Sequence, residues 1–125
     1  MNVKMAVKTV RKTIERQYDG TCTVYKYKDV EDENTHLTSK QKVAVYEEQP
    51  CHLSYETLSS TEEGSGAVHV SQMTKLFCAP ELIIEPGSCI VVTQAGRTEN
   101  YERSGKGAVY ETHQEIPLKL AAVYA

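Results

Sequence analysis

The hydrophobic period of this chain changes once, close to its start, and this change limits the fold more than any other feature. Residues 1–18 carry apolar side chains at helical spacing, with mostly Lys, Arg, Thr and Glu between them. These apolar positions are Val3, Val7, Val10 and Ile14. The spacing predicts an amphipathic helix that ends at the Asp19-Gly20 turn signal. After that turn the period falls to two, which is typical of strands.

The segments with period two are short and are separated by turn signals. Ala95-Gly96 is one such signal, and two polar stretches, residues 29–41 and residues 57–66, are expected to form long exposed loops. Several short strands with regularly spaced turns are typical of a small barrel or sandwich. We therefore expect one mainly β domain over residues 1–125. It would be a small antiparallel β-barrel of six or seven strands, with an N-terminal helix over residues 1–18 and those two long polar loops.

The last predicted strand shows a clear alternation. Ile116, Leu118 and Leu120 share one face, which we expect to be the core side. Pro117 lies on the other face and has no N–H to donate to a ladder. We therefore expect this strand to lie at an edge or to be bulged at the proline.

The overall charge and the cysteines narrow the classes of function. The formal net charge is −3, so no global positive field would recruit nucleic acid. No segment approaches the ~20 apolar residues of a membrane span, and no signal-peptide core begins the chain. We therefore expect synthesis in a reducing cytoplasm and no membrane partner. The four cysteines lie far apart without a C-x-x-C pair, which favours small reduced residues in the core. They are Cys22, Cys51, Cys78 and Cys89.

The segment S-G-K-G-A-V-Y-E-T-H-Q-E-I-P-L-K-L (104–120) contains residue types that carry chemistry in other proteins. Its Gly105-Lys106-Gly107 has neither the spacing of a phosphate-binding loop nor a helix after it, so a turn between antiparallel strands explains it. The sequence has no G-x-S-x-G elbow and no nucleophile locally paired with a base. We therefore expect no enzymatic activity and no bound cofactor.

Three residues of the same segment suggest an alternative, a metal site. Glu111, His113 and Glu115 alternate, so a strand would place two carboxylates and an imidazole on one face. Ile116 and Leu118 mark the opposite face as the core side, which favours a solvated, charged sheet face over a metal centre. Metal analysis of the purified protein would distinguish the two interpretations.

Four stretches occur in a fixed order along the chain. They are Q-P-C-H-L-S-Y (49–55), Q-M-T-K-L-F-C-A-P (72–80), I-E-P-G-S-C-I-V-V-T-Q-A-G (84–96) and S-G-K-G-A-V-Y-E-T-H-Q-E-I (104–116). This series resembles the head closure proteins of long-tailed bacteriophages and defective prophages, which are also called stoppers or head–tail connectors. The resemblance runs from about Tyr18 to Leu120 and is densest after Pro50. It implies a small β-barrel that assembles as a homo-oligomeric ring below the portal and adaptor rings.

The resemblance also implies a function and partners. The ring would close the DNA channel after packaging, and tail terminator or tail tube proteins would attach below it. Packaged DNA would lie in the channel without sequence-specific binding. The protein would belong to the virion neck and be assembled in the cytoplasm of the bacterial host. The alternatives are another neck or tail-completion ring protein and, from a different class, a small metal- or ligand-binding β-barrel.

Two groups of residues are candidates for contacts in such a ring. Tyrosine is enriched at interfaces, and acidic side chains keep DNA from adhering to a channel wall. The candidate interface residues are Tyr25, Tyr27, Tyr46, Tyr110, Glu31, Asp32 and Glu33. The acidic residues belong to the stretch 29–41, which is expected to contact a neighbouring ring.

The second polar stretch is expected to face the channel. Its two glycines could act as hinges, and its hydroxyls could hydrogen-bond across a symmetry axis. The candidate channel residues are Thr57, Leu58, Ser59, Ser60, Thr61, Glu62, Glu63, Gly64, Ser65 and Gly66.

Overall fold

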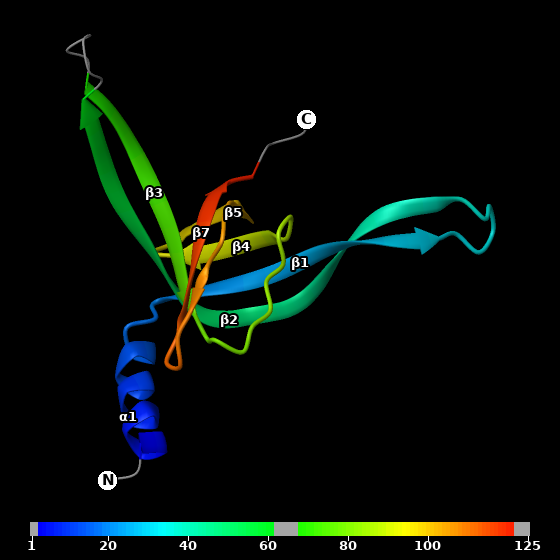
Figure 1. The fold of residues 1–125 in the computed structure, drawn as a ribbon. Helices are drawn as coiled ribbons and strands as arrows, with labels where there is room; N and C mark the ends of the chain where they lie inside the picture. The colour runs from blue at the N-terminus through cyan, green and yellow to red at the C-terminus, as the bar shows by residue number, and fades with distance from the viewer. Residues whose placement is uncertain (1–2, 62–67, 122–125) are drawn as a thin grey trace.

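The computed structural model describes residues 3–61 and 68–121, which form one helix and seven strands (Figure 1). The elements are α1 (Val3–Glu15), β1 (Gly20–Glu31), β2 (Thr38–Thr61), β3 (Val68–Cys78), β4 (Cys89–Gln94), β5 (Arg97–Arg103), β6 (Ala108–Val109) and β7 (Gln114–Leu120). The strand pairs are antiparallel throughout. No helix in these two ranges is long and apolar enough to cross a membrane.

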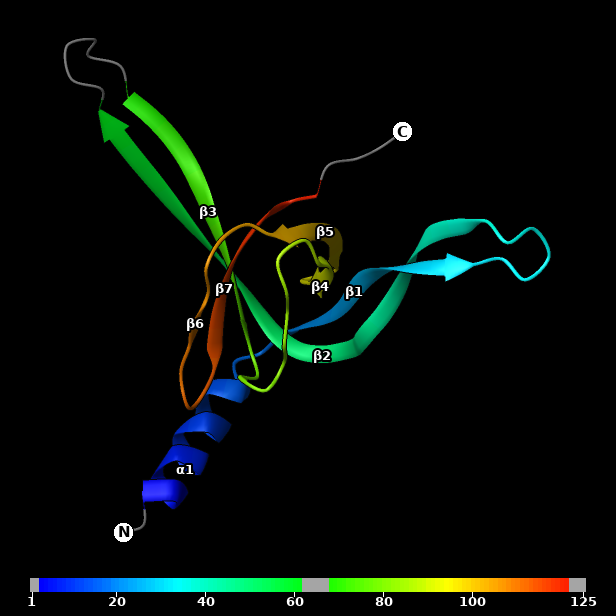
Figure 2. The same ribbon diagram turned by 45° about the vertical axis from the view of Figure 1, so that its right-hand side comes forward.

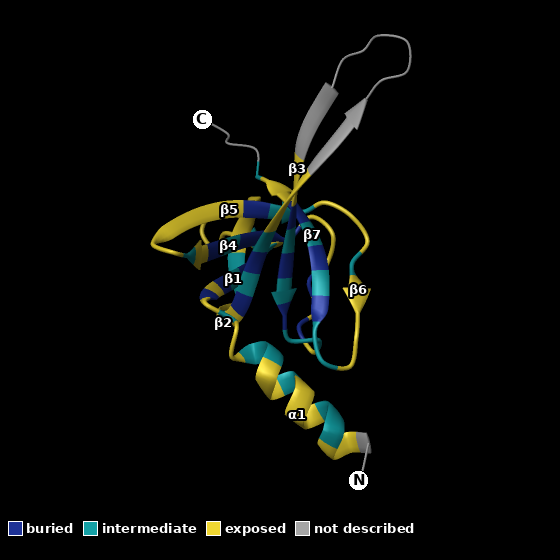
Figure 3. Ribbon diagram, turned by 90° about the vertical axis from the view of Figure 1, so that its left-hand side faces the viewer, coloured by how far each residue is buried: buried dark blue, intermediate teal, exposed yellow. Residues whose placement is uncertain are grey.

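The sheet closes on itself. Hydrogen bonds follow the order β3-β2-β1-β4-β5-β7-β6, and β3 also pairs with β7, so six strands form a closed sheet and the short β6 flanks β7. The predicted mainly β, antiparallel fold with one N-terminal helix is therefore confirmed. Figure 3 shows the buried residues gathered along the strands of this closed sheet, while α1 lies outside it.

The core consists of the inward-facing side chains of these strands. In β7 the buried residues Gln114, Ile116 and Leu118 alternate with less buried ones, as the period of two predicts. Leu120, which was predicted on the same core face, is 65% exposed at the end of the strand, so that part of the prediction was wrong. Leu76 of β3 lies directly opposite Leu53 of β2 on one side and Ile116 of β7 on the other. The second of these pairs belongs to the β3–β7 pairing that closes the sheet. All three side chains are buried. Burial of such a row favours the closed sheet over an open one.

The turn at Ala95-Gly96 forms where the sequence predicts it. The prediction that the last strand lies at an edge or is bulged at Pro117 was wrong, because β7 pairs with β3 on one side without a register shift and with β5 and β6 on the other. Ala95 and Gly96, with φ of 53° and 76°, connect β4 to β5 in the left-handed region that a two-residue hairpin turn requires. Pro117 lies opposite Lys75 of β3, and its carbonyl oxygen accepts a hydrogen bond from Ser104 N at 2.9 Å. Its ring nitrogen faces the same side, between the end of β5 and the start of β6, where no ladder hydrogen bond is lost.

The long strand β2 belongs to two hairpins. Its part before Cys51 pairs mainly with β1, and its part from Cys51 onward pairs with β3. Between them Glu48 has a φ of 45°, and the register with β1 shifts on both sides of Val24. Such irregularities bend a strand and increase its twist. As a result the two hairpins leave the closed sheet in different directions (Figures 1 and 2).

The predicted polar loops and helix are shorter than the sequence suggested. Residues 29–31 and 38–41 belong to paired strands, which leaves residues 32–37 as the turn. Residues 57–61 are also strand and pair with residues 68–72, whereas Glu62 to Gly66 lie outside the described residues. A hairpin that projects beyond the core has water on both faces, so its strands show no apolar alternation from which to predict them.

Two glutamine side chains take the place of missing backbone hydrogen bonds. Leu53 N donates to Gln94 Oε1 at 2.7 Å, and Gln94 Nε2 donates to Leu53 O at 3.1 Å, which links β4 to β2 across the closed sheet. Gln114 is buried and donates from Nε2 to Ala79 O and Leu82 O, both at 2.7 Å. The connection between β3 and β4 is thereby held against the core.

The four cysteines are buried and free, as predicted. Cys51 and Cys78 are direct cross-strand neighbours in β2 and β3. Burial raises the pKa of the Cys78 thiol to about 12, so this thiol stays protonated at neutral pH. This thiol therefore packs as a small apolar group.

Replacing Cys51 or Cys89 by alanine should lower the free energy of unfolding by about 1–2 kcal/mol, because each sulfur fills space in the packed core. Urea denaturation of the variants measures this change. Adding a reductant to the wild-type protein should leave its midpoint unchanged. A large destabilisation by reductant would contradict the assignment of free thiols.

Candidate interaction surfaces

Two hairpin arms project from the closed sheet. The first arm consists of residues 25–44, from β1 and β2 with the turn between them, and the second arm consists of residues 55–61 of β2 and 68–74 of β3 (Figure 1). β4 pairs with β1 only as far as Tyr25, and β7 pairs with β3 only from Thr74. Beyond these points the described parts of both arms are two-stranded, with both outer edges open.

Open arms of this kind need a partner. An isolated two-stranded hairpin is marginally stable in water, and an unpaired strand edge offers N–H and C=O groups to another chain. In the first arm residues 27–42 are exposed apart from the half-buried Val30. The arms are therefore the strongest candidate contact surfaces.

The tip of the first arm carries the three acidic residues that the sequence singled out. Asp32 shapes the turn, since its Oδ1 accepts hydrogen bonds from Asn34 N at 2.8 Å and Thr35 N at 3.4 Å. Glu31 and Glu33 are exposed. The tip also exposes a large apolar side chain, Leu37, which is 69% exposed in the middle of a polar run. Sequence reasoning missed this residue.

The four candidate tyrosines fall into two groups. Tyr27 and Tyr110 are 57% and 50% exposed, so they are open to contact with another chain. Tyr25 is half-buried, with Lys42 Nζ 4.4 Å from the centre of its aromatic ring. Tyr46 packs against the core and accepts a hydrogen bond from Ile83 N at 3.1 Å, so it already serves the fold.

The helix α1 is attached to the body mainly through its last turns. Arg11 donates from Nη2 to Glu81 Oε2 at 2.7 Å, and its Nε donates to Glu15 Oε1 at 2.7 Å. The hydrogen bond from Arg11 lowers the pKa of the Glu81 carboxyl. The hydroxyl of Tyr18 is buried without a hydrogen-bond partner among the described residues, and this burial raises its pKa to about 12. Met5, nearer the start of the helix, is 65% exposed.

A row of aromatic side chains lies beside the base of the helix. His113 stacks between Phe77 and Tyr110, with ring centroids 5.8 Å and 4.9 Å away. His52 lies near the edge of the same row, 6.3 Å from Phe77, and its Nδ1 is 2.8 Å from Asp19 Oδ1. The hydrogen bond with His52 lowers the pKa of Asp19. His52, Phe77 and His113 line a shallow pocket together with Ile14, Gln17, Tyr18 and Ser54.

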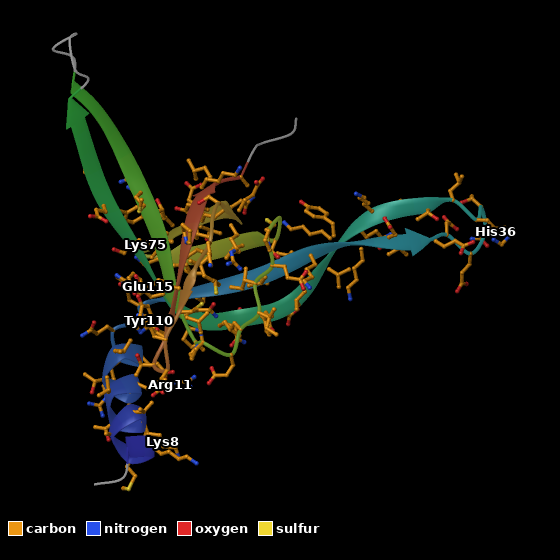
Figure 4. All side chains as sticks on the ribbon, in the orientation of Figure 1. Lys8, Arg11, His36, Lys75, Tyr110 and Glu115 are labelled. Carbon is orange, nitrogen blue, oxygen red and sulfur yellow. The ribbon has the colours of Figure 1, made fainter. Side chains whose placement is uncertain are left out.

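The alternative of a metal site on this face is not supported by the geometry. His113 Nε2 lies 3.0 Å from Glu115 Oε2, but β7 begins only at Gln114, and Glu111 lies in the turn before it. The prediction that one strand would present Glu111, His113 and Glu115 together was therefore wrong. Glu115 is instead close to Lys75, at 3.9 Å, on the neighbouring strand (Figure 4). No group of three metal-ligating side chains occurs within the described ranges.

Comparison with known proteins adds a likeness of fold. No protein-family model matches the chain, and no curated protein matches its sequence. One solved structure with a similar fold is the phage-like element PBSX protein xkdH of Bacillus subtilis. The two chains are 12% identical, with a TM-score of 0.50 over 80% of this chain and 91% of that chain. At this identity the likeness establishes a shared fold.

Proposed function

We propose that this protein is a structural component of a bacteriophage or phage-derived particle, at the neck between head and tail. It forms a homo-oligomeric ring below the portal and adaptor, closes the DNA channel after packaging, and offers the tail its attachment surface. The fold shared with a phage-like element protein supports this proposal. The observation that carries it is the pair of open hairpin arms on a small closed sheet.

The arms suit a ring protein for a physical reason. The first arm contains seven residue pairs from Tyr25↔Ala44 to Glu31↔Thr38, which span about 20 Å at about 3.3 Å per residue. That reach exceeds the ~10 Å between two packed sheets, so the arm extends well beyond the closed sheet of its own chain (Figure 1). Contacts that use different surfaces of identical chains close into rings when the rotation allows it. The rigid body thus positions a subunit, and the arms join it to its neighbours.

The second arm is the segment we assign to the channel. Its described strands, residues 55–61 and 68–74, connect through the sequence E-E-G-S-G-A, which is rich in Glu and Gly. Such a segment can line a channel and be displaced when DNA leaves, since its paired residues 57–61 and 68–72 lie beyond the pairing of β3 with β7. Carboxylates along the channel repel the DNA backbone, so DNA passes without being bound.

The proposal requires no catalytic activity and no cofactor. A second candidate is another neck or tail-completion ring protein, because open arms would serve any ring in this region. The position of the chain in the particle separates the two candidates.

Electron cryomicroscopy of intact particles that contain this protein tests the proposal. We expect a ring of this chain directly below the adaptor, with Tyr27 and Tyr110 buried against neighbouring subunits or the adaptor. A ring placed next to the tail tube instead would favour the second candidate. Absence of the chain from the neck, or full exposure of both tyrosines in the assembled ring, would contradict the proposal.

A further inference from the structure

A row of cations runs along the helix α1 and into the residue that follows it. Lys4, Lys8, Lys12 and Arg16 follow one another at every fourth position. Residues at that spacing lie on one side of a helix about 6 Å apart, and like charges there destabilise it. Lys8 and Lys12 form no ion pair with any described residue. We call this row the cationic ridge.

The ridge is open to contact and has an apolar neighbour. Lys8 extends from α1 away from the strands, whereas Arg11, three residues further along the helix, reaches the body through Glu81 (Figure 4). Met5 is three residues from Lys8 and seven from Lys12, so it lies on the same side of the helix as the ridge. It is 65% exposed, and methionine adapts well to a contacting surface. The ridge therefore offers cations beside one flexible apolar side chain.

The charges of the chain are segregated in a way that identifies the partner. Residues 1–16 contain five of the 14 basic residues and one of the 17 acidic residues. The other 109 residues therefore contain nine basic and sixteen acidic residues. The densest acidic run is Glu31, Asp32 and Glu33 at the tip of the first arm, and this tip also exposes Leu37. Each surface thus combines charge of one sign with one exposed apolar side chain, and the two are complementary.

These two surfaces cannot meet within one chain. The first arm and α1 project from the body in different directions, and their ends lie far apart in both views (Figures 1 and 2). The helix has 13 residues and is about 20 Å long, comparable to the reach of the arm. The acidic tip can therefore contact a cationic ridge only on another copy, in a head-to-tail arrangement.

We propose that the acidic tip of the first arm of one copy binds the cationic ridge of a second copy, with Glu31 and Glu33 against Lys8 and Lys12. Leu37 packs against Met5 in the same contact. This inference rests on the proposed ring and specifies how neighbouring copies recognise each other within it. It assigns the acidic tip to a neighbouring copy, whereas the sequence alone suggested a neighbouring ring.

Charge reversal tests the contact with the full-length chain. One variant carries Lys8→Glu and Lys12→Glu, and the other carries Glu31→Lys and Glu33→Lys. Asp32 is left intact because it shapes the turn. We expect the wild-type chain to associate reversibly in sedimentation experiments at low salt and high concentration, and to dissociate as salt is raised. Each variant alone should associate at least about tenfold more weakly than the wild-type chain, since its tip and ridge then carry like charges.

Rescue provides the matched control. An equimolar mixture of the two variants, and a single chain with all four substitutions, should each regain association because opposite charges face each other again. Carbodiimide crosslinking of a mixture of isotopically labelled and unlabelled wild-type chains should join Lys8 or Lys12 of one copy to Glu31 or Glu33 of another. A wild-type chain that stays monomeric up to about 1 mM would overturn the inference. Association of either variant at wild-type strength, or crosslinks confined to other residues, would overturn it as well.

The same variants separate this contact from the proposed function. If particles made with either single reversal variant still contain the neck ring, the contact is wrong and the ring proposal stands. If the wild-type chain itself is absent from the neck, the proposed function fails.

Discussion

Particles made with a shortened second arm are expected to fill with DNA and then lose it. Thr57 and Gln72 lie directly opposite each other in β2 and β3, so Asn-Gly can join them in place of residues 58–71. The buried row at Leu53 and Leu76 lies nearer the body and keeps its neighbours, so the variant should fold and join the neck. Without the segment that closes the channel, the packaged DNA should escape. DNA protected from nuclease within purified particles measures this loss.

The first arm provides a matched control. Lys28 and Gln41 are also opposite each other, and Asn-Gly in place of residues 29–40 removes the acidic tip. If the tip joins neighbouring copies, this chain should be absent from the particles, whereas the chain with the shortened second arm should be present. Full retention of DNA in particles that contain the shortened second arm would contradict its assignment to the channel. Leakage only from particles that contain the shortened first arm would assign closure to that arm.

The part of the fold that buries side chains could be predicted from sequence. In β7 the alternation of Ile116 and Leu118 identified the core face, and the turn at Ala95-Gly96 identified the β4–β5 hairpin. Burial imposes a period of two on a strand, so the pattern and the structure have the same cause. The pairing of β3 with β7 could not be predicted, because it joins segments about 40 residues apart and depends on the whole set of strands.

The strands of the two arms could not be predicted from an alternating pattern of burial. Residues 29–31 and 57–61 are strand because their partners across the hairpin supply backbone hydrogen bonds, and residues 29–31 are mostly exposed to water. A polar sequence in such a strand cannot be told from a loop by its side chains alone. For the same reason the sequence identified Glu31 to Glu33 as a contact surface but missed Leu37, whose exposure becomes visible only in the structure.

The cationic ridge was present in the sequence, but its meaning depended on the structure. The spacing of Lys8 and Lys12 is readable from the sequence, yet a charged row on a helix usually faces water. What distinguishes this row is that α1 lies outside the closed sheet (Figure 3) and that an acidic tip lies out of its reach in the same chain. Both facts come from the arrangement of elements in space.

Replacing Leu76 by alanine should lower the free energy of unfolding by about 3–4 kcal/mol. The side chain of Leu76 is fully buried at the centre of the row that joins β2, β3 and β7, between Leu53 and Ile116. Removing its methyl groups leaves a cavity that neighbours on both sides cannot fill without moving a strand. Because β3 provides the pairing with β7 that closes the sheet, the loss affects closure itself. Urea denaturation monitored by circular dichroism measures the change.

Leu120 of the same sheet supplies the control, because it is 65% exposed near the end of β7. Its replacement by alanine should change the free energy of unfolding by less than about 0.5 kcal/mol, since little apolar surface leaves the core. The contrast between two leucines isolates burial from residue type and from strand propensity. A loss below about 1 kcal/mol at Leu76 would mean that β3 and β7 do not close the sheet in solution. A similar loss at both leucines would mean that Leu120 is also buried in solution. Association of two copies over the surface around Leu120 would have this effect.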